Sequence, residues 1–104
     1  MIQAIKKLLG IAPPVDFSEL VRTGATILDV RTKDEYAGGH IRGSVNIPVD
    51  QLASNINKLK DKQKPVITCC ASGMRSATAK SILKSKGFVN VHNGGSWMSL
   101  QNKI

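Results

Sequence analysis

Aromatic side chains are scarce in this 104-residue sequence and account for only 4% of its residues. Proteins that bind single-stranded nucleic acid stack bases on exposed rings, so this class is disfavoured. No apolar run approaches the roughly 18 residues that a membrane-spanning helix needs. The basic, amphipathic start, residues 1–9, lacks the long apolar region and the cleavage site of a signal peptide. We therefore expect a cytoplasmic protein that binds neither nucleic acid nor a membrane.

The chain has only two cysteines, Cys69 and Cys70, and they are adjacent. Neighbouring cysteines do not readily form a relaxed disulfide, and two cysteines do not make a disulfide framework. No CxxC pair or cysteine–histidine cluster has the spacing of a zinc site, so we expect no metal and no cofactor. Both thiols are therefore inert core residues, or one of them is reactive.

Acidic side chains are also few, 7 against 15 lysines and arginines, which gives a formal net charge of +8. Residues 1–50 carry equal numbers of each sign, so the whole excess lies in residues 51–104, where Asp61 is the only acid. The simplest interpretation is a solvated, lysine-rich surface. The alternative is that this half attracts a small anionic substrate or an acidic protein partner.

Hydrophobic patterning predicts four short strands, separated by helices. The strand candidates are Ile27–Val30, Val45–Ile47, Val66–Cys69 and Phe88–Val91. Strands that alternate with helices indicate an α/β fold, in which helices cover both faces of a parallel sheet. We expect one such domain over residues 15–104, preceded by a basic amphipathic segment, residues 1–14.

The helices and turns between these strands have their own signals. A helix capped by Asp50 should carry Leu52, Ile56 and Leu59 on one face. A second helix is expected over residues 75–86, since a glycine follows it at the position of a C-terminal stop. The run Asn93-Gly94-Gly95 is typical of a turn.

The segment 70–76, with the sequence Cys-Ala-Ser-Gly-Met-Arg-Ser, lies between a predicted strand and a predicted helix. Ligands of α/β sheets bind at the carboxyl ends of strands, where such loops lie. The positive end of the helix should stabilise a Cys70 thiolate, lowering the cysteine pKa from about 8.5 to roughly 3.5–7.5. Small residues let several backbone N–H groups converge on an anion held against this sulfur. The residues that we expect to bind the anion are Ala71, Ser72, Gly73, Met74 and Arg75.

Several motifs occur in a characteristic order around this loop. They are Asp29-Val30-Arg31, Glu35-Tyr36, Gly39-His40-Ile41, Asn46-Ile47-Pro48, the Cys70 loop, and Gly94-Gly95 followed by Trp97. In this combination the chain resembles the single-domain rhodaneses, which are sulfurtransferases. The resemblance implies a three-layer α/β/α fold with a five-stranded parallel sheet. It also implies that Cys70 takes a sulfane sulfur from a small anionic donor such as thiosulfate, and passes it from a persulfide to cyanide or a thiol acceptor.

Three residues of the loop region have two interpretations each. Cys69, at the end of a predicted buried strand, is a core residue or a second thiol that resolves a Cys70 persulfide. Arg75 is a charge on the helix surface, or it acts at the site, where it binds the anion or fixes the loop to a carboxylate. Ser76 is a helix-cap residue or contacts the persulfide.

Charged residues outside the loop also have two interpretations. Asp29, Arg31 and Glu35 form a structural set of ion pairs or shape the rim of the site. His40 is a hydrogen-bonded turn residue or an acid–base group. Arg42 is a solvated charge or helps to recruit an anionic donor.

Loop length separates two possible chemistries. Four residues lie between Cys70 and Arg75, whereas the tyrosine-phosphatase signature has five, which suit a tetrahedral phosphate. A small phosphatase or an arsenate reductase is therefore the weaker enzyme hypothesis. A third hypothesis is a persulfide carrier or interaction module without turnover of its own, which docks an acidic protein. We expect the protein to be a monomer.

Overall fold

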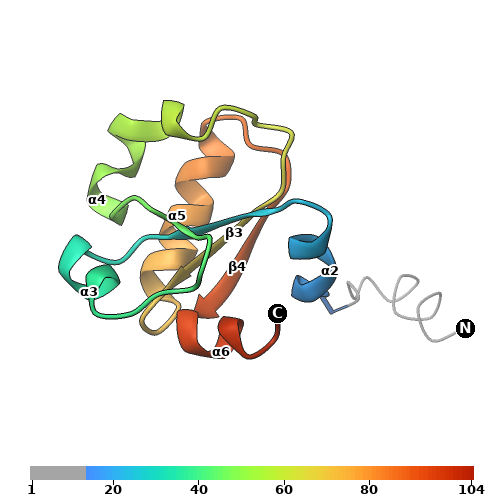
Figure 1. The fold of residues 1–104 in the computed structure, drawn as a ribbon. Helices are drawn as coiled ribbons and strands as arrows, with labels where there is room; N and C mark the ends of the chain where they lie inside the picture. Colours follow the sequence, from blue (N-terminus) through green and yellow to red (C-terminus); the bar gives the residue numbers. More distant parts are fainter. Residues whose placement is uncertain (1–13) are drawn as a thin grey trace, which may run out of the picture.

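The computed structural model describes residues 14–104, so the expected N-terminal segment lies almost entirely outside the described residues (Figure 1). The elements in chain order are α2 (Phe17–Arg22), β1 (Thr26–Asp29), α3 (Lys33–Ala37), β2 (Val45–Asn46), α4 (Val49–Leu52), the 3-10 helix η1 (Ala53–Lys58), β3 (Val66–Cys70), α5 (Met74–Ser85), β4 (Val91–Ser96) and α6 (Trp97–Gln101). Within residues 14–104, no helix combines the length and apolar character needed to cross a membrane.

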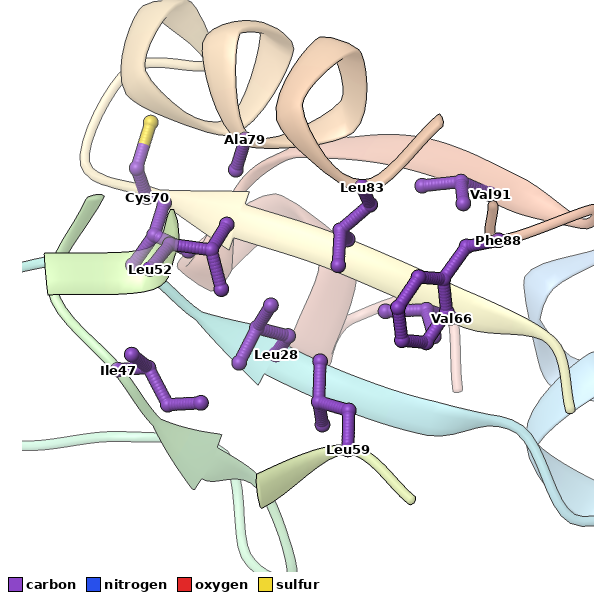
Figure 2. Packing of buried hydrophobic residues seen from close by; sticks show 11 residues of the cluster. Leu28, Ile47, Leu52, Leu59, Val66, Cys70, Ala79, Leu83, Phe88 and Val91 are labelled. Carbon is purple, nitrogen blue, oxygen red and sulfur yellow. The ribbon is translucent and has the colours of Figure 1, made fainter. Parts of the chain in front are cut away.

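The four strands form one sheet in the order β2-β1-β3-β4, and every neighbouring pair is parallel. Side chains of the central strands alternate between the two faces of this sheet. Leu28 therefore packs with Leu52 and Leu83 in a cluster beneath α4 and α5, part of which Figure 2 shows. Ile27 belongs to the opposite cluster with Leu100, against α2 and α6. Helices thus cover both faces, which confirms the three-layer α/β/α fold.

The sheet has four strands and not the five that the family resemblance implied. Residue patterning alone indicated four strands, and no further segment of residues 14–104 forms one. The edge strand β2 is only two residues long, because the chain turns at Pro48 into α4. The expected count of five is therefore wrong for the described part of the chain.

The fourth strand begins at Val91, later than the sequence indicates. Residues 88 and 89 do not pair in the sheet, and the first bond to β3 is at Asn90, whose carbonyl accepts the Val66 N–H at 3.0 Å. The Phe88 N–H donates to the Leu83 carbonyl at 3.1 Å, and the Val89 N–H donates to the Lys62 carbonyl at 3.3 Å. Phe88 is nevertheless buried, since its ring packs in the cluster beneath α5. An apolar residue at this position is therefore explained by packing against α5 and does not indicate a strand.

The predicted turn at residues 93–95 is also wrong, because these residues lie inside β4. The pairing of β3 with β4 shifts register there, as in a β-bulge. Gly94 is required by close packing: a Cβ at this position would lie 2.8 Å from Ile67 Cγ2 and 2.9 Å from the Thr68 carbonyl oxygen. Gly94 therefore marks a point where β4 passes unusually close to its neighbours.

The expected helix from Asp50 to Leu59 is divided. Pro48 is the N-cap, Asp50 lies in the first turn without capping it, and α4 is only four residues long. Asn55 departs from helical geometry with φ of −121°, and the segment around it is 3-10 helix. The apolar face is still correct, since Leu52 and Leu59 are both buried.

Candidate active site

Cys70 is the last residue of β3, at the carboxyl end of the sheet, and α5 begins four residues later. Gly73, the N-cap of α5, has a positive φ of 103° that other residues rarely adopt. The same glycine lies against the β4 bulge, since a Cβ there would be 3.4 Å from Gly95 Cα. The loop therefore has the strand–loop–helix context expected from the sequence, and β4 supports it from the side.

Several donors of the loop converge on the Cys70 sulfur. The Gly73 N–H donates to Sγ at 2.9 Å and the Ser76 N–H at 3.3 Å. The Ser76 hydroxyl lies 3.5 Å from the same sulfur. Figure 2 shows the sulfur pointing away from the neighbouring Leu52, although the whole Cys70 side chain is buried.

The environment of Cys70 favours its ionised form. Burial acts to raise the pKa of this thiol, but hydrogen bonding with the Ser76 hydroxyl and with the N–H groups of Ser76, Gly73 and Ser72 outweighs it. The pKa of Cys70 therefore lies below that of an ordinary thiol. A lowered pKa gives more thiolate near neutral pH, and the thiolate is the nucleophilic form.

Cys69 is in the opposite environment. Its side chain is fully buried in the cluster against α2 and α6, on the other face of the sheet from Cys70. Burial, and secondarily the negative charge of Asp29, raise the pKa of Cys69 to about 12. This geometry favours core packing over the resolving role, because the sheet lies between the two thiols.

The Arg75 side chain faces a carboxylate. Its guanidinium donates to both carboxylate oxygens of Glu35 in α3, at 2.6 and 2.9 Å. The bonds from Arg75, followed by the bond from the Thr32 N–H, lower the pKa of Glu35 to about 2. Of the two interpretations of Arg75, the structure supports attachment of the loop to α3, since this charge is already paired.

Replacing Glu35 by glutamine is expected to make the free energy of unfolding depend less on pH in the acid range. The folded pKa lies near 2, below the unfolded value of about 4.3. The pair therefore stabilises the fold fully above about pH 4.3 and loses this effect as the pH falls towards 2. Because both side chains are 35% exposed, we expect a difference of less than about 1 kcal/mol. Urea unfolding of the wild type and Glu35→Gln between pH 2 and 6 measures it.

The matched control for this prediction is the same substitution in an Arg75→Gln background. There the charge partner is absent, so Glu35→Gln should change the pH dependence much less. If the free energy of unfolding fell equally with pH in the wild type and in the single Glu35→Gln variant, the role of this ion pair would be contradicted.

Asp29 and Arg31 form a buried ion pair at the end of β1. Arg31 donates from Nε to both oxygens of Asp29 at 3.0 and 3.1 Å, and from Nη2 at 2.8 Å. The same guanidinium donates to the Gly39 carbonyl at 2.7 Å and lies 4.6 Å from the centre of the Trp97 ring. This pair is structural: it joins β1, the loop after α3, and α6.

His40 and Arg42 lie in the loop between α3 and β2. The His40 ring donates from Nδ1 to the Tyr36 carbonyl at 2.7 Å and stacks on the Tyr36 ring, with centroids 3.7 Å apart. Arg42 is exposed. Within the described part of the chain neither side chain is hydrogen-bonded to the Cys70 loop, so the turn and solvated-charge interpretations fit them best.

Asn93 is a residue of the site that sequence reasoning missed. Its Oδ1 accepts the Ser76 hydroxyl at 2.6 Å and the Gly95 N–H at 2.9 Å, while its Nδ2 donates to the Gly73 carbonyl at 3.2 Å. The sequence signal was present, but an asparagine beside two glycines is more typical of a turn. Only the pairing of β4 with β3 brings it to the loop.

Five of the eight lysines of residues 51–104 lie at the other end of the sheet from Cys70. They occur at the end of η1, in the loop after it and at the end of α5, and this loop and the end of α5 run side by side in Figure 1. These lysines, which we call the lysine-rich face, are Lys58, Lys60, Lys62, Lys64 and Lys86. Since β3 has five residues, this face is about 13 Å or more from Cys70, beyond the Debye length of about 8 Å. For these five lysines the structure therefore favours the interpretation of a solvated surface.

A family model for the rhodanese-like domain matches residues 13–102. The chain belongs to the rhodanese-like family. The thiosulfate sulfurtransferase PspE of Escherichia coli is 35% identical to it over 69 residues, which cover 65% of this chain and 66% of that protein. The thiosulfate sulfurtransferase GlpE of Pseudomonas fluorescens is 35% identical over 81 residues, with coverage of 78% and 73%.

A solved structure shares the fold of this rhodanese-like chain. The human single-domain sulfurtransferase TSTD1 superimposes with a TM-score of 0.74 at 27% identity, covering 89% of this chain and 98% of that one. The chain spans only 54% to 66% of the length of three of the curated relatives that it matches. These similarities establish the fold and the family of the chain.

Proposed function

We propose that this rhodanese-like chain is a sulfurtransferase that moves a sulfane sulfur from an anionic donor, such as thiosulfate, to a thiophilic acceptor through a Cys70 persulfide. The observation that carries the proposal is that the Gly73 and Ser76 N–H groups both donate to Cys70 Sγ, at 2.9 and 3.3 Å. These groups stabilise negative charge on the sulfur. Cys70 is a thiolate when it attacks the donor and again when it is released from the persulfide, and both states need that stabilisation.

In the first half-reaction the Cys70 thiolate attacks the outer sulfur of thiosulfate. A new S–S bond forms while the S–S bond of the donor breaks, and sulfite leaves with the electron pair of that bond. The product is a Cys70 persulfide with one negative charge on its outer sulfur. The N–H groups of Met74 and Arg75 have no partner within α5, because they belong to its first turn, and they are available to this outer sulfur.

In the second half-reaction an acceptor, cyanide or a thiolate, attacks the outer sulfur. The persulfide S–S bond breaks and its electron pair returns to Cys70 as a thiolate. Charge is balanced in both steps, and the donor product leaves before the acceptor binds, so ping-pong kinetics are expected.

Access to the sulfur requires movement of the loop. Cys70 has no exposed surface, whereas Met74 in the same loop is 79% exposed. The donor therefore reaches Sγ only when the loop is displaced. Residues 71–73 are small and exposed or half-buried, so the groups that oppose this displacement are the hydrogen bonds of Gly73 with Cys70 Sγ and with the Asn93 amide.

Mass spectrometry after exposure to thiosulfate is the direct test of the proposed function. We expect the intact protein to gain the mass of one sulfur atom, located on the peptide that contains Cys70, and to lose it after addition of cyanide. The Cys69→Ala variant is the matched control, and it should gain the same sulfur. An unmodified wild-type protein, or a modification that persists in Cys70→Ser, would overturn the proposal.

The same hydrogen bonds argue against phosphatase or arsenate reductase chemistry. The Gly73 and Ser76 N–H groups are directed at Cys70 Sγ itself, at 2.9 and 3.3 Å. A phosphate cradle needs such N–H groups to point past the sulfur at the oxygens of the anion. A tight loop of this kind suits the addition of one sulfur atom.

The carrier hypothesis is weaker for a different reason. An acidic partner would be attracted to the lysine-rich face, where a cavity of about 280 Å³ is lined by Lys58, Lys60 and Lys64. A partner docked there would lie at the end of the sheet opposite to Cys70, so its own acceptor thiol would be far from the persulfide. This placement favours small donors and acceptors that reach Cys70 directly.

A further inference from the structure

The Ser76 hydroxyl has one proton and several neighbours that compete for it. Its Oγ lies 2.6 Å from Asn93 Oδ1, 3.1 Å from the Gly73 carbonyl oxygen and 3.5 Å from Cys70 Sγ. Asn93 Oδ1 and the Gly73 oxygen only accept hydrogen bonds, and a thiolate also only accepts them. The 2.6 Å contact is the shortest of the three, so the proton lies between Ser76 and Asn93. The neutral Cys70 thiol then donates its own proton to Ser76 Oγ.

The orientation of the Asn93 amide is determined by its other contacts. Oδ1 accepts the Gly95 N–H at 2.9 Å, and Nδ2 donates to the Gly73 carbonyl at 3.2 Å. A flipped amide would place NH2 against the Gly95 N–H and oxygen against the Gly73 oxygen, which loses both bonds. The acceptor end of Asn93 is therefore held towards Ser76.

We propose that Asn93 is a positioning residue that holds the Ser76 hydroxyl proton away from Cys70, and thereby limits how readily the Cys70 thiol ionises. When Cys70 becomes a thiolate, Ser76 can donate to it only by giving up its bond to Asn93. The fully buried Ser76 has no water to replace that bond. The inference rests on the proposed function, because it assigns Asn93 a role in tuning the same nucleophile.

The other ionisable groups near Cys70 are unchanged in the variants that test this idea. Arg75 of α5 is paired with Glu35 of α3, and Asp29 at the end of β1 is paired with Arg31. Cys69 lies on the far face of the sheet. A change in Cys70 ionisation on substitution of Asn93 therefore reports on the hydrogen-bond network.

The test is the pH titration of the Cys70 thiolate, followed by its ultraviolet absorbance, in the wild type and in Asn93→Ala. Without Asn93, the nearer of the two competing acceptors, only the Gly73 carbonyl at 3.1 Å still competes with the thiolate for the Ser76 proton. Ser76 then donates to the thiolate, and the midpoint should fall by about half to one pH unit. Below the midpoint, alkylation by iodoacetamide should become faster by about threefold or more. The buried Cys69, whose pKa is raised to about 12, does not titrate in this range.

Two comparisons separate this role from simple support of the loop. If Asn93 only braces the loop, its removal loosens the Gly73 and Ser76 donors, and the midpoint should rise instead of fall. In a Ser76→Ala background the proposal expects no shift on Asn93→Ala, since the hydroxyl through which Asn93 acts is absent. A raised midpoint in the single variant, or an equal fall in both backgrounds, would overturn the proposal.

Matched variants keep the experiment interpretable. Asn90→Ala truncates an asparagine just before β4 whose side chain contacts His92 and not the loop, so it should leave the midpoint unchanged. Asn93→Ser stays polar but is too short to reach Ser76, and it should reproduce Asn93→Ala if the alanine variant folds poorly. The titration uses no sulfur donor. A failure of sulfur transfer would therefore leave the titration result intact, and an unexpected titration result would leave the proposed sulfur transfer intact.

Discussion

Replacing Cys70 by serine should lower the rate of sulfur transfer by on the order of a thousandfold or more, because a hydroxyl is not ionised near neutral pH and forms no persulfide. Stability should change little, since serine retains the small volume of cysteine and can accept the N–H groups of Gly73 and Ser76. A steady-state assay with thiosulfate and cyanide measures the rate, and thermal unfolding measures the stability.

The matched control is Cys69→Ala, which removes the neighbouring thiol on the other face of the sheet. It should transfer sulfur at nearly the wild-type rate but lose roughly 1 kcal/mol of stability, because it leaves a small cavity in the core. Loss of transfer in Cys69→Ala together with activity in Cys70→Ser would reverse the assignment of the nucleophile.

Replacing Asp29 by asparagine should destabilise the domain by about 3–5 kcal/mol, because it leaves the charge of Arg31 buried without its partner. Both side chains of this pair are almost inaccessible, at 0% and 5% exposed. A loss of this size is a large fraction of the roughly 5–15 kcal/mol that stabilises a typical domain. Urea or thermal unfolding of the wild type and Asp29→Asn measures the difference.

An exposed ion pair of the same chain supplies the control. Glu19 pairs with Arg22 on α2, where the two side chains are 54% and 70% exposed. Glu19→Gln should change the unfolding free energy far less than Asp29→Asn does, since water screens this pair. Equal small losses for Asp29→Asn and Glu19→Gln would show that the Asp29–Arg31 pair does not stabilise the fold.

These two predictions depend on different kinds of information. The special role of Cys70 follows from its position between a β-branched run and a glycine-containing loop, and this local pattern is visible in the sequence. The importance of Asp29 depends on the Arg31 guanidinium, which also reaches the Gly39 carbonyl and the Trp97 ring. The sequence placed Asp29 and Arg31 in one motif, but their complete burial is a property of the folded chain.

The distribution of charge shows the same difference. Counting residues correctly located the whole excess of +8 in the second half of the chain. It did not show that most of the lysines precede β3 or lie at the end of α5, whereas Cys70 ends β3. All strands of a parallel sheet begin at one edge of the sheet and end at the opposite edge. Residues that precede β3 therefore lie at the opposite edge from Cys70. Closeness in sequence therefore did not mean closeness in space.

Local signals were sufficient for the α/β class, the first three strands of the described chain, and the strand–loop–helix around Cys70 with its helix N-terminus. Each of these depends on the periodicity of apolar residues or on glycine within a few positions, and such interactions are short in range. Tertiary contacts were needed for the different environments of Cys69 and Cys70, the attachment of Arg75 to Glu35, and the position of Asn93 beside Ser76. Their partners lie 40 residues apart for Arg75 and 17 for Asn93. Only the packing of the parallel strands and their helices brings such distant residues together.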